Sequence, residues 1–408
     1  MNSVADSKGS AFAQTKQVRN LVVLGSTGSI GLNTLDVVEQ FPESYQIYAL
    51  CAHSRGELLS RQAQKFRPRW VHLADKTSAA AFDESLLPRG TELLRDSDAI
   101  EKIVSAPEVD LVVSAIVGFA GLFGTIEALR SGKTVALANK ESLVSAGAIV
   151  DELLKKHHGT IIPVDSEHSA VFQALAGQSL DTVERLVLTG SGGPFRGMKT
   201  QDLTLVEPQD ALRHPTWKMG PKISIDSATL MNKAFEVIEA RWLFNLPTDR
   251  IDVIIHPESI VHSFVEFKNC SILAQLSPPD MRLPIQYALE FPARRSGVAK
   301  RLDWKELRHL HFEQPDRQTF PALDLGYCVA DRGGTAGAVL NAANEAAVAC
   351  FLEGKLAFLD IAHVCDKVLN EHNYSPRPNL DEIRAVDYWA RQEVFRWNQL
   401  QHRNRTSR

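Results

Sequence analysis

The stretch NLVVLGSTGSIGLNTLDVVEQF, residues 20–41, decides the fold that we expect for this chain. An apolar run typical of a strand ends at Gly25, two more glycines follow at three-residue intervals, and an amphipathic helix begins after them. Glycine lets a backbone approach a phosphate, and the first turn of a helix offers it unpaired N–H groups. The spacing differs from the stricter G-x-G-x-x-G of dinucleotide sites, and the alternative is a mere tight turn. The succession of strand, turn and helix nevertheless favours a phosphate site.

Further strand candidates follow this stretch, with helical patterns between most of them. They read YQIYALCA, WVHLA, VDLVVSAI, TVALAN and TIIPV. Strands that alternate with helices are typical of a doubly wound parallel sheet. We therefore predict an α/β fold with a Rossmann-like N-terminal domain.

The end of the second strand candidate indicates which dinucleotide is bound. NAD sites normally place Asp or Glu there to bind the ribose 2′-hydroxyl. This chain instead has His53, Ser54 and Arg55, and its first acid is Glu57. Because an arginine and a hydroxyl suit a 2′-phosphate, the segment favours NADPH. The alternative is a solvated turn in which the arginine is incidental.

Composition and charge exclude several classes of partner. The 408 residues are 44% hydrophobic and 23% charged with a net charge of −4, so nothing electrostatic favours nucleic acid or an anionic membrane. No apolar run approaches the roughly 20 residues of a membrane-spanning helix. Residues 1–17 lack the apolar stretch of a secretory signal, and we expect a disordered lead-in. Five scattered cysteines without a C-x-x-C pair argue against a zinc knuckle or disulfides and for a reducing cytoplasm.

Two acids follow the last strand candidate in the segment PVDSEH, residues 163–168. If the strand continues through Asp165 and Glu167, their side chains project to one side and can converge on a cation, because strand side chains alternate. The alternative is a helix that begins here, capped by Ser166 or Ser169, with the acids stabilising its N-terminus.

Two later segments predict further anion sites. In LVLTGSGGPFRG (residues 186–197) a Ser/Gly-rich turn follows a strand, and successive N–H groups in such a turn can bind an anion. In KISIDSATLMNKAFEVIEARWLF (residues 222–244) we expect a short strand that ends at Ile225 and a helix that starts at 227–229. The polar residues in or near the first turns of that helix are Ser227, Asn232 and Lys233. A helix N-terminus with such side chains can hold a phosphate.

Glu236 follows on the same helix and adds a third carboxylate to Asp165 and Glu167. Three carboxylates and two anion-binding turns suggest a phosphorylated substrate that is bound with a hard cation. Oxygen ligands alone favour Mg²⁺ or Mn²⁺ over Zn²⁺. The alternative for Glu236 is a surface ion pair with Lys233, which is worth only tenths of a kcal/mol.

The pattern changes twice beyond residue 250. Residues 251–277 read as alternating strands with a hairpin turn near Lys268–Asn269, and we expect their histidines, His256 and His262, to be structural. From about residue 315 the pattern is helical, as in GTAGAVLNAANEAAVACFL, where we expect Glu345 to have a capping or packing role.

Ten motifs occur in order between about residue 20 and about residue 395. They are GSTGSIG, ALANKESLV, PVDSEHSAVFQAL, LTGSGGPFR, RHPTWKMG, KISIDSATLMNK, EARWLFN, IIHPESIVHS, PDMRLPI and LNAANEAAV. Together they resemble the 1-deoxy-D-xylulose 5-phosphate reductoisomerase family. The resemblance implies an enzyme that uses NADPH and Mg²⁺ or Mn²⁺ to convert 1-deoxy-D-xylulose 5-phosphate into 2-C-methyl-D-erythrose 4-phosphate, in the non-mevalonate (MEP) route to isoprenoid precursors. It also implies a homodimer that forms through the strands of residues 251–277.

The same resemblance implies a role for each matching residue. The metal ligands are Asp165, Glu167 and Glu236, and with Lys140 they form the catalytic set. The substrate contacts are Lys140, Ser166, Glu167, Ser191, His214, Trp217, Ser227, Asn232, Lys233 and Glu236. The cofactor contacts are Thr27, Gly28, Ser29, Ile30, Asn139, Glu141 and Gly220, with His53, Ser54 and Arg55 in place of a Gly-Lys-Asn-like segment of the family. RHPTWKMG, residues 213–220, looks like the family's mobile lid, with Met219 near the nicotinamide.

Five parts of the chain are expected from patterns and resemblance together. They are a lead-in at 1–17, an NADPH-binding domain at 18–164, a catalytic and dimerisation domain at 165–290, a linker at 291–314 and a C-terminal helical domain at 315–400.

One alternative function is an NADP-linked dehydrogenase of another phosphorylated hydroxy compound, which gives the three carboxylates no task. A second alternative is an NADP-binding regulatory protein, which the presence of Lys140, Glu167 and Glu236 disfavours.

Overall fold

The computed structural model describes residues 18–406, so the lead-in expected at 1–17 lies outside the described residues. The described residues form two compact units. The first consists of the described part of Met1–Asn139 with Val150–Phe172 and Asp280–Lys300, and the second of Lys140–Ile149, Gln173–Pro279 and the described part of Arg301–Arg408. Among the described helices, none has the length and apolar character to span a bilayer.

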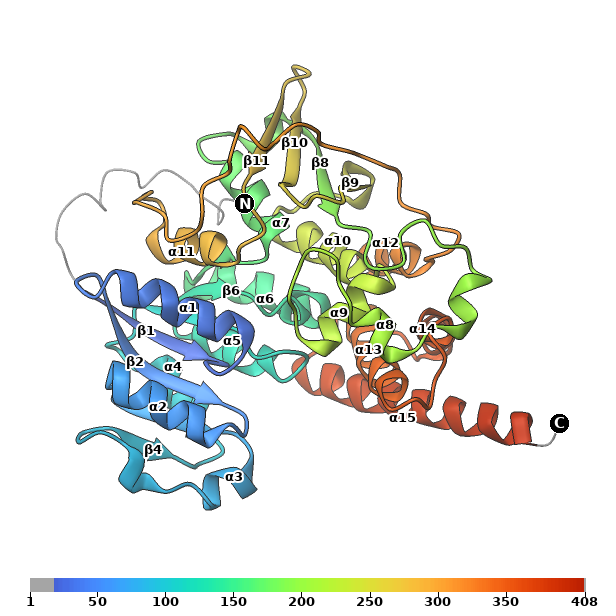
Figure 1. Cartoon of the computed structure of the whole chain (residues 1–408). Helices are drawn as coiled ribbons and strands as arrows, with labels where there is room; N and C mark the ends of the chain where they lie inside the picture. The colour runs from blue at the N-terminus through green and yellow to red at the C-terminus, as the bar shows by residue number, and fades with distance from the viewer. Residues whose placement is uncertain (1–17, 407–408) are drawn as a thin grey trace. The chain divides into compact units, whose positions relative to one another are not determined.

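The first unit is built on a seven-stranded parallel sheet in the order β4-β3-β2-β1-β5-β6-β7 (Figure 1). Its strands are β1 (Arg19–Leu24), β2 (Tyr45–Ala52), β3 (Trp70–Leu73), β4 (Glu92–Leu94), β5 (Leu111–Ser114), β6 (Thr134–Leu137) and β7 (Thr160–Pro163). The chain moves outward from β1 through β2 to β4, and then from the other side of β1 through β5 to β7. The doubly wound parallel sheet is therefore confirmed, and open sheets of this kind bind ligands where the strand order reverses, here beside β1 and β5.

Helices follow most strands of this sheet, as the sequence pattern predicts. They are α1 (Ser29–Gln40), α2 (Gly56–Phe66), α3 (Lys76–Ala80), α4 (Ala99–Ser105), α5 (Gly121–Arg130) and α7 (Ser166–Ala174), with the 3-10 turn η1 (Glu84–Leu86). The residues of α6 (Glu141–His157) divide between the two units, and Ala146 within it departs from helical geometry. Leu21, Val22 and Leu24 of β1 are fully buried, so the core of this unit surrounds its sheet.

A helix from much later in the chain completes the first unit. α11 (Arg282–Glu290) packs against α1, and the Arg19 guanidinium donates to the Leu289 carbonyl at 2.8 Å across 270 residues of sequence. Nearby, Arg295 donates to the Ser44 hydroxyl at 2.6 Å. The domain boundaries expected from the sequence remain a prediction, because groups of residues in contact need not match domains that fold alone.

The second unit contains a four-stranded mixed sheet in the order β11-β10-β8-β9. Its strands are β8 (Val183–Gly190), β9 (Ile251–Ile255), β10 (Val261–Phe267) and β11 (Ile272–Leu276). β8 pairs in parallel with β9 and antiparallel with β10, which forms a hairpin with β11. The turn predicted near Lys268–Asn269 is confirmed, since the Phe267 N–H donates to the Ser271 carbonyl across it.

The helical C-terminal part predicted from about residue 315 is also confirmed (Figure 1). Its helices are α12 (Ala322–Arg332), α13 (Ala336–Leu352), α14 (Asp360–Glu371) and α15 (Leu380–Thr406). Most of α13 is buried against α14 and α15, and its many alanines allow neighbouring helices to approach closely. The remaining elements of the unit are η2 (Leu180–Thr182), η3 (Asp202–Leu205), α8 (Pro208–Ala211), α9 (Pro221–Ala228), α10 (Met231–Leu243) and η4 (Thr248–Arg250).

The short strand expected to end at Ile225 is wrong, because this segment is the helix α9. Pro221 occupies its first turn, where the fixed φ of proline suits a helix and no N–H is needed. Ser224, Ile225 and Ala228 are buried with the spacing of one helix face. Four alternating residues were too short a pattern to distinguish a strand from this helix.

Candidate active site

The glycine-rich turn after β1 lies where the strand order of the first unit reverses. Gly25 has φ +85° and donates its N–H to the Cys51 carbonyl at the end of β2. A Cβ on Gly25 would lie 2.5 Å from the Ala115 carbonyl oxygen, next to the end of β5, so only glycine fits. Gly28 is the N-cap of α1, and no side chain caps this helix, so its first N–H groups face the turn. The structure thus places Thr27, Gly28, Ser29 and Ile30 together at a helix N-terminus suited to a phosphate.

Arg55 lies against this turn. It is the N-cap residue of α2, and its guanidinium donates to the Thr27 carbonyl at 3.1 Å. His53, Ser54 and Arg55 are all exposed directly after β2. A cation beside the glycine-rich turn supports the predicted preference for a 2′-phosphate over a 2′-hydroxyl.

Asn139 follows β6 at the same edge of the sheet and is buried. Its side-chain amide donates to the carbonyls of Ile116 at 2.7 Å and Gly118 at 3.0 Å, in the loop after β5. These bonds fix the side chain beside the point of strand reversal, where a cofactor contact is expected.

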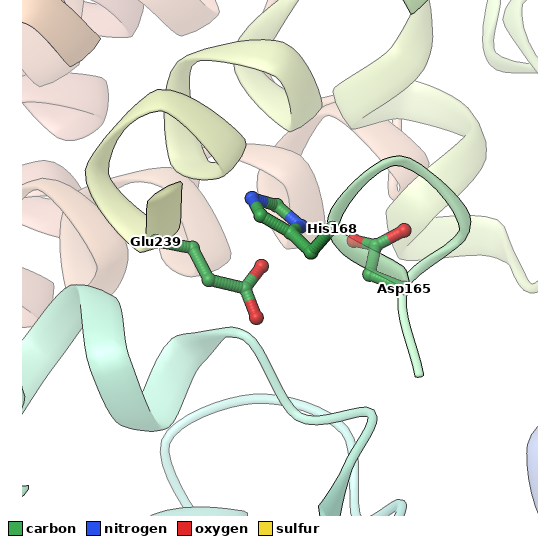
Figure 2. A group of neighbouring side chains, drawn as sticks. All are labelled: Asp165, His168 and Glu239. Atoms are coloured by element: carbon green, nitrogen blue, oxygen red, sulfur yellow. The ribbon is translucent and has the colours of Figure 1, made fainter. Parts of the chain in front are cut away.

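Asp165 and Glu167 do not continue β7 as a strand, and that expectation is wrong. β7 ends at Pro163, and the Ser169 N–H donates to the Asp165 carbonyl at 2.8 Å, so Asp165 is the N-cap of α7 and Glu167 lies in its first turn. The Ser166 hydroxyl donates to the Glu167 carboxylate. Figure 2 shows Asp165 and His168 at this start of α7. The two predicted metal ligands of the first unit therefore share one helix turn, and the acids lie at a helix N-terminus, where negative charge is favoured.

Glu236 in α10 is fully buried in the second unit, so the alternative of a surface ion pair is wrong. The Lys233 ammonium, whose side chain is 4% exposed, contacts one of its carboxylate oxygens. The other oxygen accepts from the Asn232 side-chain amide at 2.6 Å and lies 3.5 Å from the Lys140 ammonium. That ammonium also donates to the side-chain oxygen Oδ1 of Asn232 at 2.8 Å. We call Lys140, Asn232, Lys233 and Glu236 the lysine–carboxylate cluster. Figure 2 shows Glu239, one turn further along α10.

The Ser/Gly-rich turn after β8 lies against the end of α9. Gly193 has φ +70°, and a Cβ there would lie 2.7 Å from the Ser227 carbonyl oxygen. The Ser191 hydroxyl accepts from the Gly193 N–H at 3.2 Å and lies 2.9 Å from His214 Nε2. The two anion-binding segments that the sequence predicts separately are therefore neighbours in the second unit.

The expected lid, residues 213–220, has no helix or strand. His214 Nδ1 accepts from the backbone N–H groups of Thr216 at 3.2 Å and Trp217 at 2.9 Å. Nδ1 is then unprotonated, so Nε2 carries the hydrogen and donates to Ser191. Burial lowers the pKa of His214, which favours this neutral form. The half-buried Trp217 ring lies 6.3 Å from the His262 ring, centroid to centroid.

Sequence reasoning missed Lys222 and Asp226 of α9. The Lys222 ammonium lies 2.9 Å from the Glu141 carboxylate at the start of α6 and 2.8 Å from the Asp226 carboxylate. Burial raises the pKa of Glu141, but the charge and hydrogen bond of Lys222 outweigh it, and the net pKa is lowered. The Lys222–Asp226 spacing of four residues signals an ion pair only on a helix, and this segment was expected to be a strand.

Three other residues have structural contacts, as expected. His256 Nδ1 lies 2.8 Å from the His311 carbonyl oxygen, and His262 Nε2 lies 3.2 Å from that of Ser277. Glu345 of α13 pairs with Arg391 of α15 at 2.7 Å. The Glu345 pair joins two helices of the C-terminal part and fits a packing role.

Comparison with known proteins gives matches along nearly the whole chain. Residues 21–147 match the family model for 1-deoxy-D-xylulose 5-phosphate reductoisomerase, and residues 161–244 and 276–393 match models for C-terminal domains of the same enzyme. Curated proteins of that name from Chlorobium phaeobacteroides and from Caldanaerobacter subterraneus subsp. tengcongensis are each 50% identical to the chain. The alignments cover 92% and 93% of this chain and 98% and 99% of those proteins.

Solved structures agree. The Zymomonas mobilis 1-deoxy-D-xylulose 5-phosphate reductoisomerase in complex with NADPH is 42% identical, with a TM-score of 0.88 over 94% of this chain and 99% of that one. A DOX-P reductoisomerase in complex with NADPH, fosmidomycin and magnesium is 38% identical, with a TM-score of 0.89 over the same shares. The chain therefore belongs to the 1-deoxy-D-xylulose 5-phosphate reductoisomerase family.

Proposed function

We propose that the chain converts 1-deoxy-D-xylulose 5-phosphate into 2-C-methyl-D-erythrose 4-phosphate, with NADPH as reductant and a divalent cation. Family membership supports the reaction, and the solved relatives in complex with NADPH and with magnesium support the cofactors. The observation that carries the proposal is the lysine–carboxylate cluster. Two ammonium groups and a carboxylate buried together are costly to maintain for stability alone, since an apolar replacement is often at least as stable.

Asp165, Glu167 and Glu236 are proposed to hold the cation. The donor set fits, because carboxylate oxygens alone suit Mg²⁺ or Mn²⁺. Asp165 and Glu167 come from the start of α7, and Glu236 comes from α10. When bound, the ion would neutralise negative charge that develops on substrate oxygens during the rearrangement.

The substrate phosphate is proposed to bind where the turn after β8 meets α9 and α10. Ser191 and Ser227 supply hydroxyl groups, Asn232 an amide and Lys233 an ammonium group. A Cβ on Gly190 would lie 3.0 Å from Cε of Lys233, so this lysine reaches the turn that carries Ser191. Such an anchor orients the substrate through a group that does not react.

His214 and Trp217 are proposed to close over the bound substrate. His214 already links Ser191 to two N–H groups of the lid, so a ligand that engages Ser191 also engages the lid. A closed lid excludes water and keeps the rearranging carbon skeleton in place. Lys140, which reaches both Asn232 and Glu236, is proposed to move or stabilise a proton on the substrate, with Ser166 as a further contact.

The cofactor phosphates are proposed to bind at the N-terminus of α1, with Arg55 on the 2′-phosphate. Thr27 to Ile30 present the helix end, while Asn139, Glu141 and Gly220 are assigned to the remainder of the cofactor. NADPH supplies the hydride, and these residues hold it in place.

A homodimer is proposed through the second sheet. β11 is an edge strand, and its Ile272 and Leu273 side chains are 58% and 44% exposed. An exposed apolar edge strand is ready to pair with another chain. A cytoplasmic location is proposed as well, since all five cysteines are free thiols.

The test measures the rate of NADPH oxidation at a saturating concentration of 1-deoxy-D-xylulose 5-phosphate, once with Mg²⁺ and once with a chelator. Turnover that requires the metal and yields the branched product supports the proposal. Turnover with other phosphorylated hydroxy compounds but not with this sugar would support a simpler dehydrogenase. Tight NADPH binding without turnover of this sugar or of the other compounds would support a regulatory protein.

A further inference from the structure

Lys222 joins three segments to which the proposed function assigns roles. It lies in the first turn of α9, two residues after Gly220 at the end of the lid, and on the same helix as Ser227. Its ammonium reaches Glu141, the residue after Lys140, at 2.9 Å. One side chain therefore connects the lid end, the phosphate-binding helix and the start of α6.

The surroundings of this ammonium fix it in place. The Lys222 side chain is 19% exposed, and its two carboxylate partners, Glu141 and Asp226, are 8% and 2% exposed. The ammonium also lies 4.9 Å from the centroid of the ring of Phe235, the residue that precedes Glu236 in the chain. A cation over an aromatic face adds to the attraction of the two carboxylates.

The other end of the arrangement is anchored in the C-terminal helices. Asp226 accepts from the Asn344 amide of α13 at 2.7 Å, which ties α9 to a buried helix. Asp226 therefore joins α9 to α13, while Lys222 joins α9 to Glu141 at the start of α6. Without the ammonium, the two buried carboxylates would lose the cation that both contact, and Glu141 would lose a charge-assisted hydrogen bond.

We propose that Lys222 is a positioning residue for the cofactor: it fixes the Glu141 carboxylate and the first turn of α6 in the orientation that NADPH binds. The proposal rests on the proposed role of Glu141 at the cofactor. It assigns Lys222 no contact with NADPH or substrate. It differs from a purely structural ion pair in predicting that cofactor affinity and folding stability respond separately to changes in this network.

Direct NADPH binding, measured by titration of the cofactor fluorescence without substrate, separates these roles. In Lys222→Gln we expect the NADPH dissociation constant to rise about tenfold or more, because Glu141 loses a charge-assisted hydrogen bond. In Asp226→Asn, which keeps the Lys222–Glu141 pair, we expect the melting temperature to fall and the dissociation constant to stay within about threefold of the parent value. Equal NADPH affinity in Lys222→Gln and the parent, or the same loss in both variants, would overturn the proposal.

Lys155→Gln is the matched control. Lys155 also pairs with an aspartate four residues away, Asp151 on α6, but both side chains are exposed. This variant should bind NADPH as the parent does. If Lys222→Gln does not fold, Lys222→Arg decides: weaker NADPH binding at an unchanged melting temperature supports the proposal, and unchanged binding contradicts it. A parent protein that fails to bind NADPH at all would instead refute the proposed function.

Discussion

The turn at Gly25 and the lysine–carboxylate cluster at Glu236 both prepare this chain for anionic ligands, by opposite physical means. The turn uses backbone N–H groups and a helix end, with almost no charged side chain apart from Arg55. The cluster uses buried charges whose partners lie 92 and 96 residues apart in the sequence. The turn is therefore sensitive to the shape of its backbone, and the cluster is sensitive to its balance of charge. Substitutions should affect the two regions differently.

The largest effect is expected from Glu236→Gln. The change keeps the length of the side chain and one acceptor oxygen but removes the negative charge from the cluster. Turnover should fall at least about a hundredfold, because metal stabilisation of developing charge is worth several kcal/mol. NADPH affinity should not change, since the turn at Gly25 is untouched. Steady-state kinetics at saturating Mg²⁺ and a fluorescence titration measure the two quantities. Near-normal metal-dependent turnover would remove Glu236 from the proposed metal site.

Gly25→Ala should weaken NADPH binding, which Glu236→Gln leaves unchanged, and the effect should be smaller. The new Cβ would meet the Ala115 carbonyl, and alanine disfavours a φ of +85°. We expect a loss of roughly 1–3 kcal/mol of folding stability and weaker NADPH binding. Thermal denaturation and NADPH titration check this outcome, with Gly90→Ala as the control, because Gly90 also has positive φ but no atoms near its Cβ position. Parent-like NADPH binding in Gly25→Ala would show that the turn tolerates a shift.

Arg55→Ala tests the single charged side chain at the turn. Loss of a charge-assisted phosphate contact costs about 1.5–3 kcal/mol, and solvent at this exposed site reduces that value. The preference for NADPH over NADH in kcat/KM should fall about tenfold, with NADH kinetics nearly unchanged. A parent protein that uses both cofactors equally well would refute the role given to Arg55.

Trp217→Ala tests the lid. The ring is half-buried and its segment has no helix or strand, so its loss removes little from the core. We expect KM for the sugar phosphate to rise several-fold, by roughly 1 kcal/mol of lost apolar contact, at a nearly constant melting temperature. A large drop in melting temperature would place Trp217 in the core instead.

The smallest expected effect is a pH dependence from His214. Burial lowers the pKa of His214 below its ordinary value of 6.5, so the folded state favours the neutral ring. The stability that the neutral His214 ring allows is fully present above pH 6.5. It is lost as the pH falls toward the lowered pKa, because the unfolded chain then binds the proton more readily than the folded chain does. Between pH 7.5 and 5.5 the melting temperature of the parent should fall slightly more than that of His214→Gln. Identical pH profiles would mean that protonation does not disturb the bonds to Thr216 and Trp217.

The difference between the two regions also explains what the sequence could reveal. The turn after β1 is a local structure, and its strand, glycines and helix lie within one quoted stretch, so residues and context predicted it together. The cluster depends on long-range packing. Sequence patterns gave Glu236 and Lys233 a surface alternative, and only the fold shows that both are buried and that Lys140 reaches them.

Local errors had local causes. Asp165 and Glu167 follow an apolar run, and the segment PVDSEH is compatible both with a continued strand and with a helix that begins there, so the sequence left the choice open. The ion pair of Lys222 with Asp226 was not predicted either, because its segment was expected to be a strand and is the helix α9. The family resemblance assigned more site residues than the patterns did, and Glu141 is one of them. It assigned no role to Lys222 or Asp226, because these residues act through others.

The packing of α11 on α1 has a consequence for how this chain is made. β1 and α1 leave the ribosome early, but the helix that covers them is synthesised some 270 residues later, as the contact between Arg19 and Leu289 shows. Until then the face that α11 covers is open to water and to other chains. Contacts so distant in sequence slow folding and prolong the lifetime of aggregation-prone intermediates. Newly made chains should therefore depend most on chaperones between the synthesis of α1 and that of α11, and a fragment that ends before Asp280 should be prone to aggregate.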